Sequence, residues 1–381
     1  MHEIKTINLG QESSNGMKYK IVDTTAGSFE TRCSAYNQSI EKVEGILKSQ
    51  KKGVLFAPPL KVWTFMYDRA FKPRQKFLYI KQLTESRITG KEFHGVNIFD
   101  YEINFLKRQL TGSDKVVLVN YLMPLEHWKL FNKEDVLSMC LALCKTGTPH
   151  ITIPVSPRWS AEDSLRVLET IKINMNSNQS YFLNIHPHMD LDEQKRLVNT
   201  INIDNKCKGV IMNGCTPMEA HNMVSYRLVS KALPNDKLLI FSDVQDVFGG
   251  YKLPTQIAFR MLNADITCRA VKPYLAGNIF SNERKKSFNK VGIYVDEVGA
   301  ILNEHEQKQW TGKSTTSLLN EHFSLQDNVN SRELALAYNF SALNKTAEIE
   351  RRCIDQEIHE KYIEDRVHLS AFMNAIQKIK V

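Results

Sequence analysis

The stretch HITIPVSPRWSAEDSLRVLETIKINMNSNQSYFLNIHPHMDLDEQKRLVNTINIDNKCKGVIMN, residues 150–213, decides the fold. It contains three short apolar runs, each typical of a buried strand: 150–155, 181–186 and 209–213. Two amphipathic segments with helical spacing, 161–173 and 191–200, separate them. Because only a crossover of this length returns a strand to the same end of a sheet, the pattern predicts parallel β-strands joined by helices.

The same alternation continues outward in both directions. Further apolar runs occur at 53–57, 76–81, 115–121, 237–242 and 265–270. Further amphipathic segments occur at 100–110, 133–144, 218–232 and 254–262. Eight strand candidates alternating with helices predict an α/β fold, a (β/α)8 TIM-type barrel closed by parallel strands.

The two ends of the chain differ from this pattern. Residues 18–33 hold two β-prone runs around Gly27 and predict an N-terminal β-hairpin. From residue 291 we expect a helix near 295–304, a polar stretch at 310–317 and a long, charged, solvated helix from about 331 to 380. The predicted organisation is a β extension (1–45), the barrel (46–290) and a helical C-terminal extension (291–381).

Composition narrows the class of protein. The 381 residues are 42% hydrophobic and 24% charged, which suits a compact globular chain. The sequence lacks a run of eighteen apolar residues and the pattern of a signal peptide, so we expect a cytoplasmic protein that makes no membrane contact. Its 7 cysteines are scattered without a CxxC pair, so we expect buried reduced thiols, with neither a disulfide framework nor a four-cysteine zinc site. The preferred interpretation of the sequence includes no metal and no cofactor.

Polar residues follow most of the predicted strands. Active sites of such barrels lie at the C-terminal strand ends. This rule selects Pro58, Pro59, Asn120, Tyr121, Ser156, Arg158, Trp159, Asn184, His186, His188, Asn213, Gly214, Asp243, Gln245, Asp246 and Arg269. His186 and His188 could bind a metal or shuttle a proton, or could be ordinary polar pocket and loop residues. Asp243 or Asp246 could act as nucleophile or base, or could be a loop carboxylate.

The net charge of +8 suits a polyanionic partner such as nucleic acid. A basic run follows the last predicted strand, on the side where barrel ligands enter. Its candidate phosphate contacts are Lys272, Arg284, Lys285, Lys286 and Lys290. A solvated loop is the alternative interpretation of the same charges.

Four segments resemble the tRNA-guanine transglycosylase superfamily. They are DLDEQKRL at 190–197, GVIMNG at 209–214, ALPNDKLLIF at 232–241 and NADITC at 263–268. The resemblance implies a barrel that exchanges a guanine for a 7-deazaguanine-type base in DNA or tRNA. Its partners would be nucleic acid and a purine-like base.

The resemblance also implies roles for individual residues. The position of the family's nucleophilic aspartate falls on Cys268, that of a second aspartate falls near Asn120, and that of the base-reading glutamine falls near His186. The family's zinc-binding cysteines are absent, and Asp243 is the best substitute nucleophile. Arg158 and Arg269 would meet phosphate or the purine, Asn213 and Gly214 the base edge, and Trp159 or Tyr121 would stack on the ring, with Ser156 nearby.

Three hypotheses therefore remain open. The first is a base-exchange enzyme of this transglycosylase type, a pentosyltransferase. The second is a metal-assisted barrel enzyme that uses His186, His188 and Asp243. The third is a catalytically silent subunit that binds nucleic acid, with the C-terminal helices as the interface to a second copy or to a different subunit.

Overall fold

The computed structural model describes residues 1–53, 55–66, 110–122, 132–213, 220–244, 247–248, 252–269, 292–325 and 332–378, together with Lys107 and Trp128.

Eight parallel strands form a ring, which confirms the predicted barrel. They are β4 (Cys33–Ala35), β5 (Leu60–Met66), β6 (Val116–Leu122), β7 (His150–Val155), β8 (Ser180–Ile185), β9 (Cys207–Asn213), β10 (Leu238–Val244) and β13 (Ile266–Arg269). Six of them form one sheet in the order β4-β13-β10-β9-β8-β7, and β5 pairs with β6. Tyr36 joins the two parts, since its N–H donates to Leu60 O (3.0 Å) and its carbonyl accepts from Val62 N–H (2.9 Å). β6 lies beside β7 and completes the ring.

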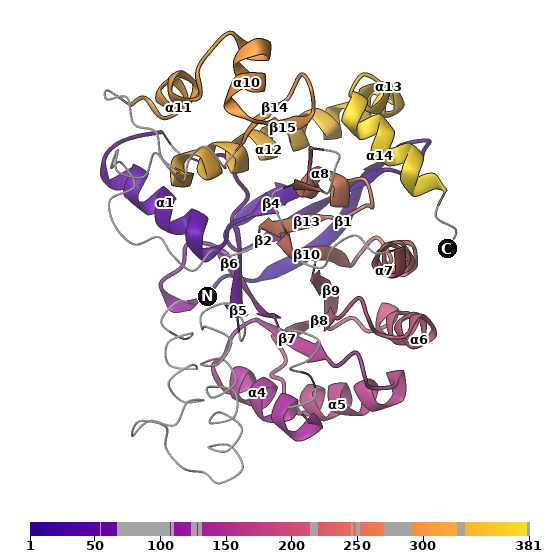
Figure 1. The fold of residues 1–381 in the computed structure, drawn as a ribbon. Coiled ribbons are helices and arrows are strands. Elements are labelled where there is room, and N and C mark those ends of the chain that lie inside the picture. The colour runs from indigo at the N-terminus through magenta and orange to yellow at the C-terminus, as the bar shows by residue number, and fades with distance from the viewer. Residues whose placement is uncertain are drawn as a thin grey trace.

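Helices cover the outside of the ring (Figure 1). They are α1 (Gln38–Ser49), α4 (Lys133–Lys145), α5 (Ala161–Ile173), α6 (Leu191–Asn202), α7 (Ala220–Ala232) and the short α8 (Thr255–Arg260). Three begin at side-chain caps: Asn37, Ser160 and Asp190 each accept a hydrogen bond from a backbone N–H in the first turn. The caps at Ser160 and Asp190 are local signals for the predicted helices at 161–173 and 191–200, which are confirmed. The helices predicted at 133–144 and 218–232 are also confirmed, as α4 and α7.

Each barrel strand alternates between two apolar layers, as the two-residue period of a strand requires. On β6, Val116 and Leu118 belong to the cluster inside the ring, whereas Val117 and Val119 belong to the cluster between strands and helices. The interior is therefore a packed core.

An antiparallel sheet closes the N-terminal end of the barrel. It consists of β1 (Ile4–Glu12), β2 (Lys18–Thr24) and β3 (Gly27–Glu30), so the predicted hairpin is confirmed and has one additional strand. Ile7 and Val22 pack into the interior cluster, and Ile4 N–H donates to Nε2 of His150 at 2.8 Å. The C-terminal ends of the strands, called the mouth below, lie at the opposite end of the ring.

The first two predicted strands, 53–57 and 76–81, have different outcomes. The strand expected at 53–57 is wrong: β5 begins at Leu60, after Pro58 and Pro59, which have no N–H to donate to a neighbouring strand. The segment 76–81 and most of the expected helix 100–110 lie outside the described residues. The first barrel strand, β4, instead falls inside the segment 1–45 that we expected to be an extension. The domain limits themselves stay predictions.

The C-terminal part also differs from expectation. The helix expected near 295–304 is wrong: β14 (Ile293–Val295) and β15 (Ala300–Leu302) form a hairpin whose turn contains Gly299 at φ 67°. α10 (Glu304–Thr311) and α11 (Thr315–Phe323) follow. The single helix expected from 331 to 380 is divided into α12 (Arg332–Asp355), α13 (His359–Glu364) and α14 (Val367–Gln377).

α12 is largely buried against β4 instead of solvated, so the tail completes the barrel wall. Two short strands, β11 (Val247–Phe248) and β12 (Leu253–Pro254), pair with each other between β10 and α8. Within the described ranges no helix combines the length and the apolar character needed to cross a membrane.

Candidate functional site

A chain of neutral polar side chains crosses the barrel near the C-terminal ends of four strands. Asn184 Nδ2 donates to Asn120 Oδ1 (2.5 Å), and Asn120 Nδ2 donates to Ser242 Oγ (2.8 Å). Ser242 Oγ donates to Asn213 Oδ1 at 2.9 Å. All four side chains are buried, at 4% exposure or less. We call Asn120, Asn184, Asn213 and Ser242 the amide layer.

Strand alternation places the amide layer directly above the apolar filling of the barrel. Leu118, Ile211 and Ile240 lie inside the ring two residues before Asn120, Asn213 and Ser242 on the same strands. Tyr226 from α7 fixes one end, since its hydroxyl donates to the Asn213 carbonyl at 3.0 Å. Buried amides satisfied in this way hold their donors and acceptors in fixed directions.

His186 lies just beyond the amide layer, after β8. It is 6% exposed, and its Nδ1 accepts the backbone N–H of His188 at 3.2 Å. Burial, and secondarily the neighbouring His188, lower the pKa of His186 to about 4. His186 is therefore neutral at physiological pH. Since Nδ1 accepts, Nε2 carries the proton and can donate it in a hydrogen bond.

The described side chains form no group of three or more His, Cys, Asp or Glu that could hold a metal ion. The third ligand that the metal-assisted hypothesis takes from Asp243 belongs to a side chain outside the description. The rings of His186 and His188 lie 5.4 Å apart, centroid to centroid.

The loop after β7 supplies an aromatic and a cationic group. Ser156 is buried, and its Oγ accepts the backbone N–H of Arg158 at 3.3 Å. Trp159 is half-buried and meets the Trp128 ring edge-on, with centroids 6.3 Å apart. Arg158 is exposed. An indole and a guanidinium thus lie next to each other in sequence on one side of the mouth.

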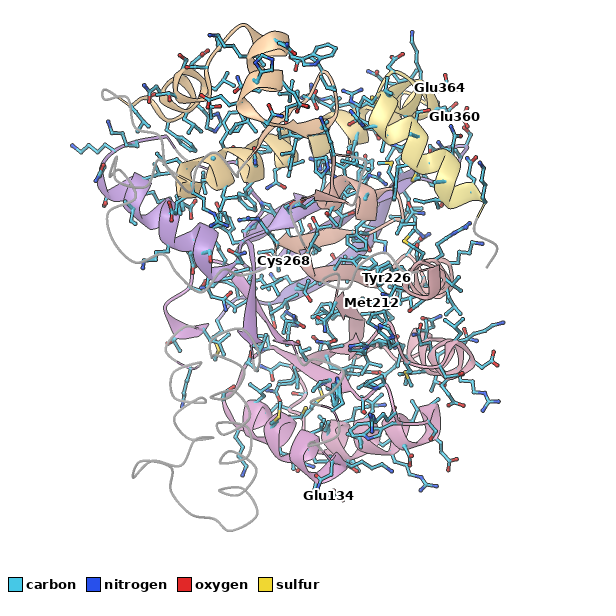
Figure 2. The ribbon with its side chains drawn as sticks, in the orientation of Figure 1. Glu134, Met212, Tyr226, Cys268, Glu360 and Glu364 are labelled. Atoms are coloured by element: carbon cyan, nitrogen blue, oxygen red, sulfur yellow. The ribbon has the colours of Figure 1, made fainter. Side chains whose placement is uncertain are left out.

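Cys268 and Arg269 end the last strand in different surroundings. Cys268 lies within the ring of strands, in the interior apolar cluster, and its Sγ contacts Tyr36 O at 3.8 Å (Figure 2). Arg269 is 7% exposed, and its carbonyl accepts from Asn37 Nδ2 at 2.8 Å. Asn37 also caps α1, so it connects the first and last strand ends of the barrel.

Several predicted site residues cannot be placed. The backbone of Asp243 lies in β10, one residue before the strand ends at Val244, but its side chain and that of Tyr121 lie outside the description. The remaining predictions outside the described residues are Gly214, Gln245, Asp246, Lys272, Arg284, Lys285, Lys286 and Lys290.

The sequence brought Asn120, Asn184 and Asn213 forward, but not Ser242, Asn37 or Trp128. Ser242 directly precedes Asp243 near the end of a predicted strand, and this position is a signal that could have identified it. Asn37 precedes a helix, and the missed β4 hid its place at a strand end. Nothing in the local sequence of Trp128 indicates its contact with Trp159.

No protein-family model matches this chain, and no curated protein matches it. Among solved structures it is similar to a chain of the tryptophan synthase α2β2 complex from the hyperthermophile Pyrococcus furiosus, with 9% identity and a TM-score of 0.35 over 62% of this chain and 87% of that chain. It is also similar to an enolase from the environmental genome shotgun sequencing of the Sargasso Sea, with 13% identity and a TM-score of 0.29 over 70% of this chain and 69% of that chain. At these scores neither similarity bears on what the mouth binds.

Proposed function

We propose that the C-terminal mouth of the barrel binds a nucleobase carried by DNA or tRNA and exchanges it for a 7-deazaguanine-type base. The observation that carries this proposal is the amide layer. It offers neutral donors and acceptors at the closed end of the mouth, the groups that read the edge of a heterocyclic base.

The side chains of the amide layer and His186 are neutral, which favours a ligand whose buried part is also neutral. Asn120, Asn213 and Ser242 carry no charge, and His186 is neutral because its pKa lies near 4. A buried anion or cation there would lack a counter-charge among these groups, which is costly. A flat heterocycle with several hydrogen-bonding atoms suits these groups better.

The rim supports a nucleic acid as the carrier of that base. Trp159 is only half-buried and can stack on a base, and the exposed Arg158 lies beside it in the sequence. The chain as a whole carries a net charge of +8, which favours a polyanion. A base flipped out of its strand would reach the amide layer while its phosphates stay at the rim.

The proposed reaction is a double displacement. An Asp243 carboxylate oxygen attacks C1′ of the nucleotide, the glycosidic bond breaks, and its electron pair leaves with the base nitrogen, which takes a proton from water. The incoming base then gives its N–H proton to water or hydroxide, and the freed nitrogen attacks C1′ and displaces the carboxylate. Asn120, Asn213 and His186 hold the base, and we assign no step to Cys268.

Substitution of Asp243 by Asn tests the chemical step. We expect exchange of radiolabelled guanine into tRNA or DNA to fall to background, because an amide cannot form the glycosyl ester. Guanine binding, measured by calorimetry, stays within about twofold of the wild type. Asp246→Asn, three residues further on, is the matched control and keeps its exchange activity. Exchange by Asp243→Asn at the wild-type rate would reject Asp243 as the nucleophile.

A second substitution tests binding separately. Asn213→Ala removes one amide of the layer and should weaken guanine binding about tenfold, the usual effect of one lost polar contact. If the wild type binds guanine but never exchanges it, the exchange reaction is wrong and the protein is the silent binding subunit of the third hypothesis. Unchanged binding by Asn213→Ala would contradict the proposed site itself.

A further inference from the structure

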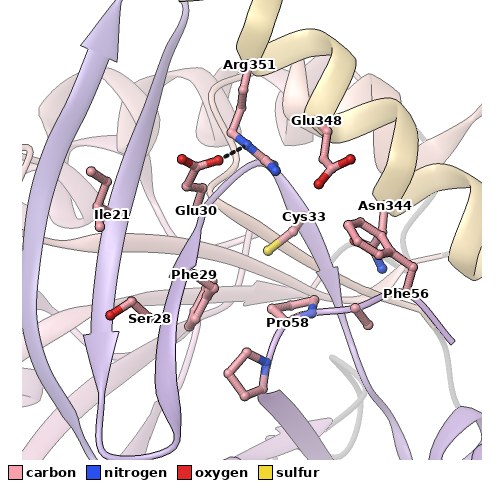
Figure 3. Close-up of a pocket in the computed structure, with 12 residues that line it drawn as sticks. Ile21, Ser28, Phe29, Glu30, Cys33, Phe56, Pro58, Asn344, Glu348 and Arg351 are labelled. Atoms are coloured by element: carbon pink, nitrogen blue, oxygen red, sulfur yellow. Dashed lines mark hydrogen bonds and ion pairs between the residues drawn. The ribbon is translucent and has the colours of Figure 1, made fainter. Parts of the chain in front are cut away.

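A cavity lies at the N-terminal end of the barrel, where Cys33 begins β4 and Pro59 precedes β5. Figure 3 shows the residues that line it. It has a volume of about 470 Å³, within the usual range for small-molecule sites. Its walls come from β2 and β3, from the segment 56–59 that precedes β5, and from one face of α12, with Cys33 at the start of β4.

The walls of this cavity combine apolar and polar side chains. Phe29 and Pro58 line it, and Ile21 and Phe56 flank it with exposures of 37% and 40%. Burial raises the pKa of the Cys33 thiol to about 12, so this lining residue is uncharged. Large apolar side chains left partly in water gain free energy when a ligand covers them.

Most polar groups of the cavity already have partners. Arg351 Nε contacts Glu30 Oε2 at 2.7 Å, and another guanidinium nitrogen donates to Thr31 O at 3.0 Å. Asn344 uses both of its amide atoms on the backbone of Ser34, at 2.7 and 3.2 Å. Glu30 and Arg351 therefore cancel each other in charge.

Glu348 is the remaining charge. Its carboxylate lies at the wall of the cavity (Figure 3), and it makes no ion pair with a described residue. Glu348 leaves the cavity with one net negative charge next to an apolar surface. This combination fits a ligand with one positive charge and an apolar body.

We propose that this cavity binds a small organic amine, with its ammonium group on Glu348 and its apolar body against Ile21, Phe29 and Phe56. The carboxylate of Glu348 would repel a ligand that bears a carboxylate or phosphate. Arg351, the cation in the cavity wall, is already paired with Glu30. The site is independent of the proposed function, because it lies at the other end of the barrel and shares no residue with the mouth.

Calorimetry with 2-phenylethylamine tests the proposal, and 2-phenylethanol serves as its uncharged analogue of the same shape. We expect the amine to bind at least about tenfold more tightly than the alcohol, as a charge-assisted hydrogen bond predicts. Glu348→Gln should remove this preference. Glu364→Gln, an exposed carboxylate on α13, is the matched control and should leave it unchanged.

Phe56→Ala provides a second variant, since it should weaken the binding of amine and alcohol alike. Wild-type protein that binds neither compound, or binds both equally, would overturn the proposal. So would an amine preference that survives in Glu348→Gln. A lysine-containing peptide that binds here when 2-phenylethylamine does not would replace the small amine by a protein partner.

Discussion

At the scale of single residues, Asp265 shows how a motif can be structural. Asp265 belongs to the segment NADITC, one of the four segments that resemble a known family, at the start of the last predicted strand. In the structure its carboxylate pairs with Lys20 Nζ at 2.8 Å and accepts Leu239 N–H at 2.8 Å. Both side chains of the pair are 3% exposed. Asp265 therefore ties β13 to β10 and to the sheet that closes the barrel.

Asp265→Asn should destabilise the fold without a specific effect at the mouth. The change leaves Lys20 buried without its counter-charge, which costs about 3 to 5 kcal/mol in free energy of unfolding. Urea unfolding followed by circular dichroism measures the loss. Asp236→Asn, a largely exposed carboxylate, should stay within about 0.5 kcal/mol of the wild type. A stable Asp265→Asn would refute the structural role.

At the scale of elements, α12 determines whether the barrel is complete. Asn344 on this helix bonds to both backbone groups of Ser34, the middle residue of β4. Glu350, further along the same helix, forms ion pairs with Arg32 at 3.4 Å and with Arg260 at 3.1 Å, and all three side chains are fully buried. α12 thus connects the start of the first barrel strand, β4, to α8, the helix that precedes the last strand, β13.

Glu350→Gln should loosen α12 from the barrel. It leaves two buried guanidinium groups without a carboxylate, and we expect a loss of about 3 to 5 kcal/mol. Chemical unfolding measures the stability, and hydrogen exchange of the α12 amides shows whether the helix detaches first. Glu364→Gln again serves as the exposed control. Equal stability of Glu350→Gln and the wild type would show that the carboxylate is dispensable.

At the scale of the whole molecule, three buried histidines couple the fold to pH. Burial is the main cause that lowers the pKa of His150 and of His359 to about 3, and that of His186 to about 4. His150 accepts Ile4 N–H at 2.8 Å, whereas neither ring nitrogen of His359 has a hydrogen-bond partner among the described residues. All three stay neutral in the native state at pH values where the unfolded chain is already protonated.

This difference predicts an acid-labile fold. In the unfolded chain these histidines become protonated below about pH 6.5, whereas in the native state they become protonated only at about pH 4 or below. The unfolded state therefore binds more protons in this range, and the free energy of unfolding falls as the pH is lowered. Each histidine contributes a slope of at most about 1.4 kcal/mol per pH unit. His359→Phe removes one of them and should flatten the slope between pH 6 and 4 while retaining stability at pH 7.5. Urea unfolding across this range measures it, and an unchanged slope would exclude His359.

Local signals predicted much of the barrel. β7 and α5 have the bounds read from the sequence, because an apolar run and a Ser160 cap are local features. β4 could not be found, since three residues without an apolar run become a strand only by pairing with β13 and Asn344. The helix expected at 295–304 failed because a two-strand hairpin with Gly299 satisfies the same apolar residues.

The sequence by itself determined that parallel strands and helices alternate and which strand ends carry polar groups, because these depend on residue spacing along the chain. Only the tertiary structure decided that Asn120, Asn184, Asn213 and Ser242 form one layer, since their four strands are up to 122 residues apart and meet only when the ring closes. It also decided that the charged tail is a buried wall, because Glu350 finds its counter-charges on Arg32 and Arg260, far away in the sequence.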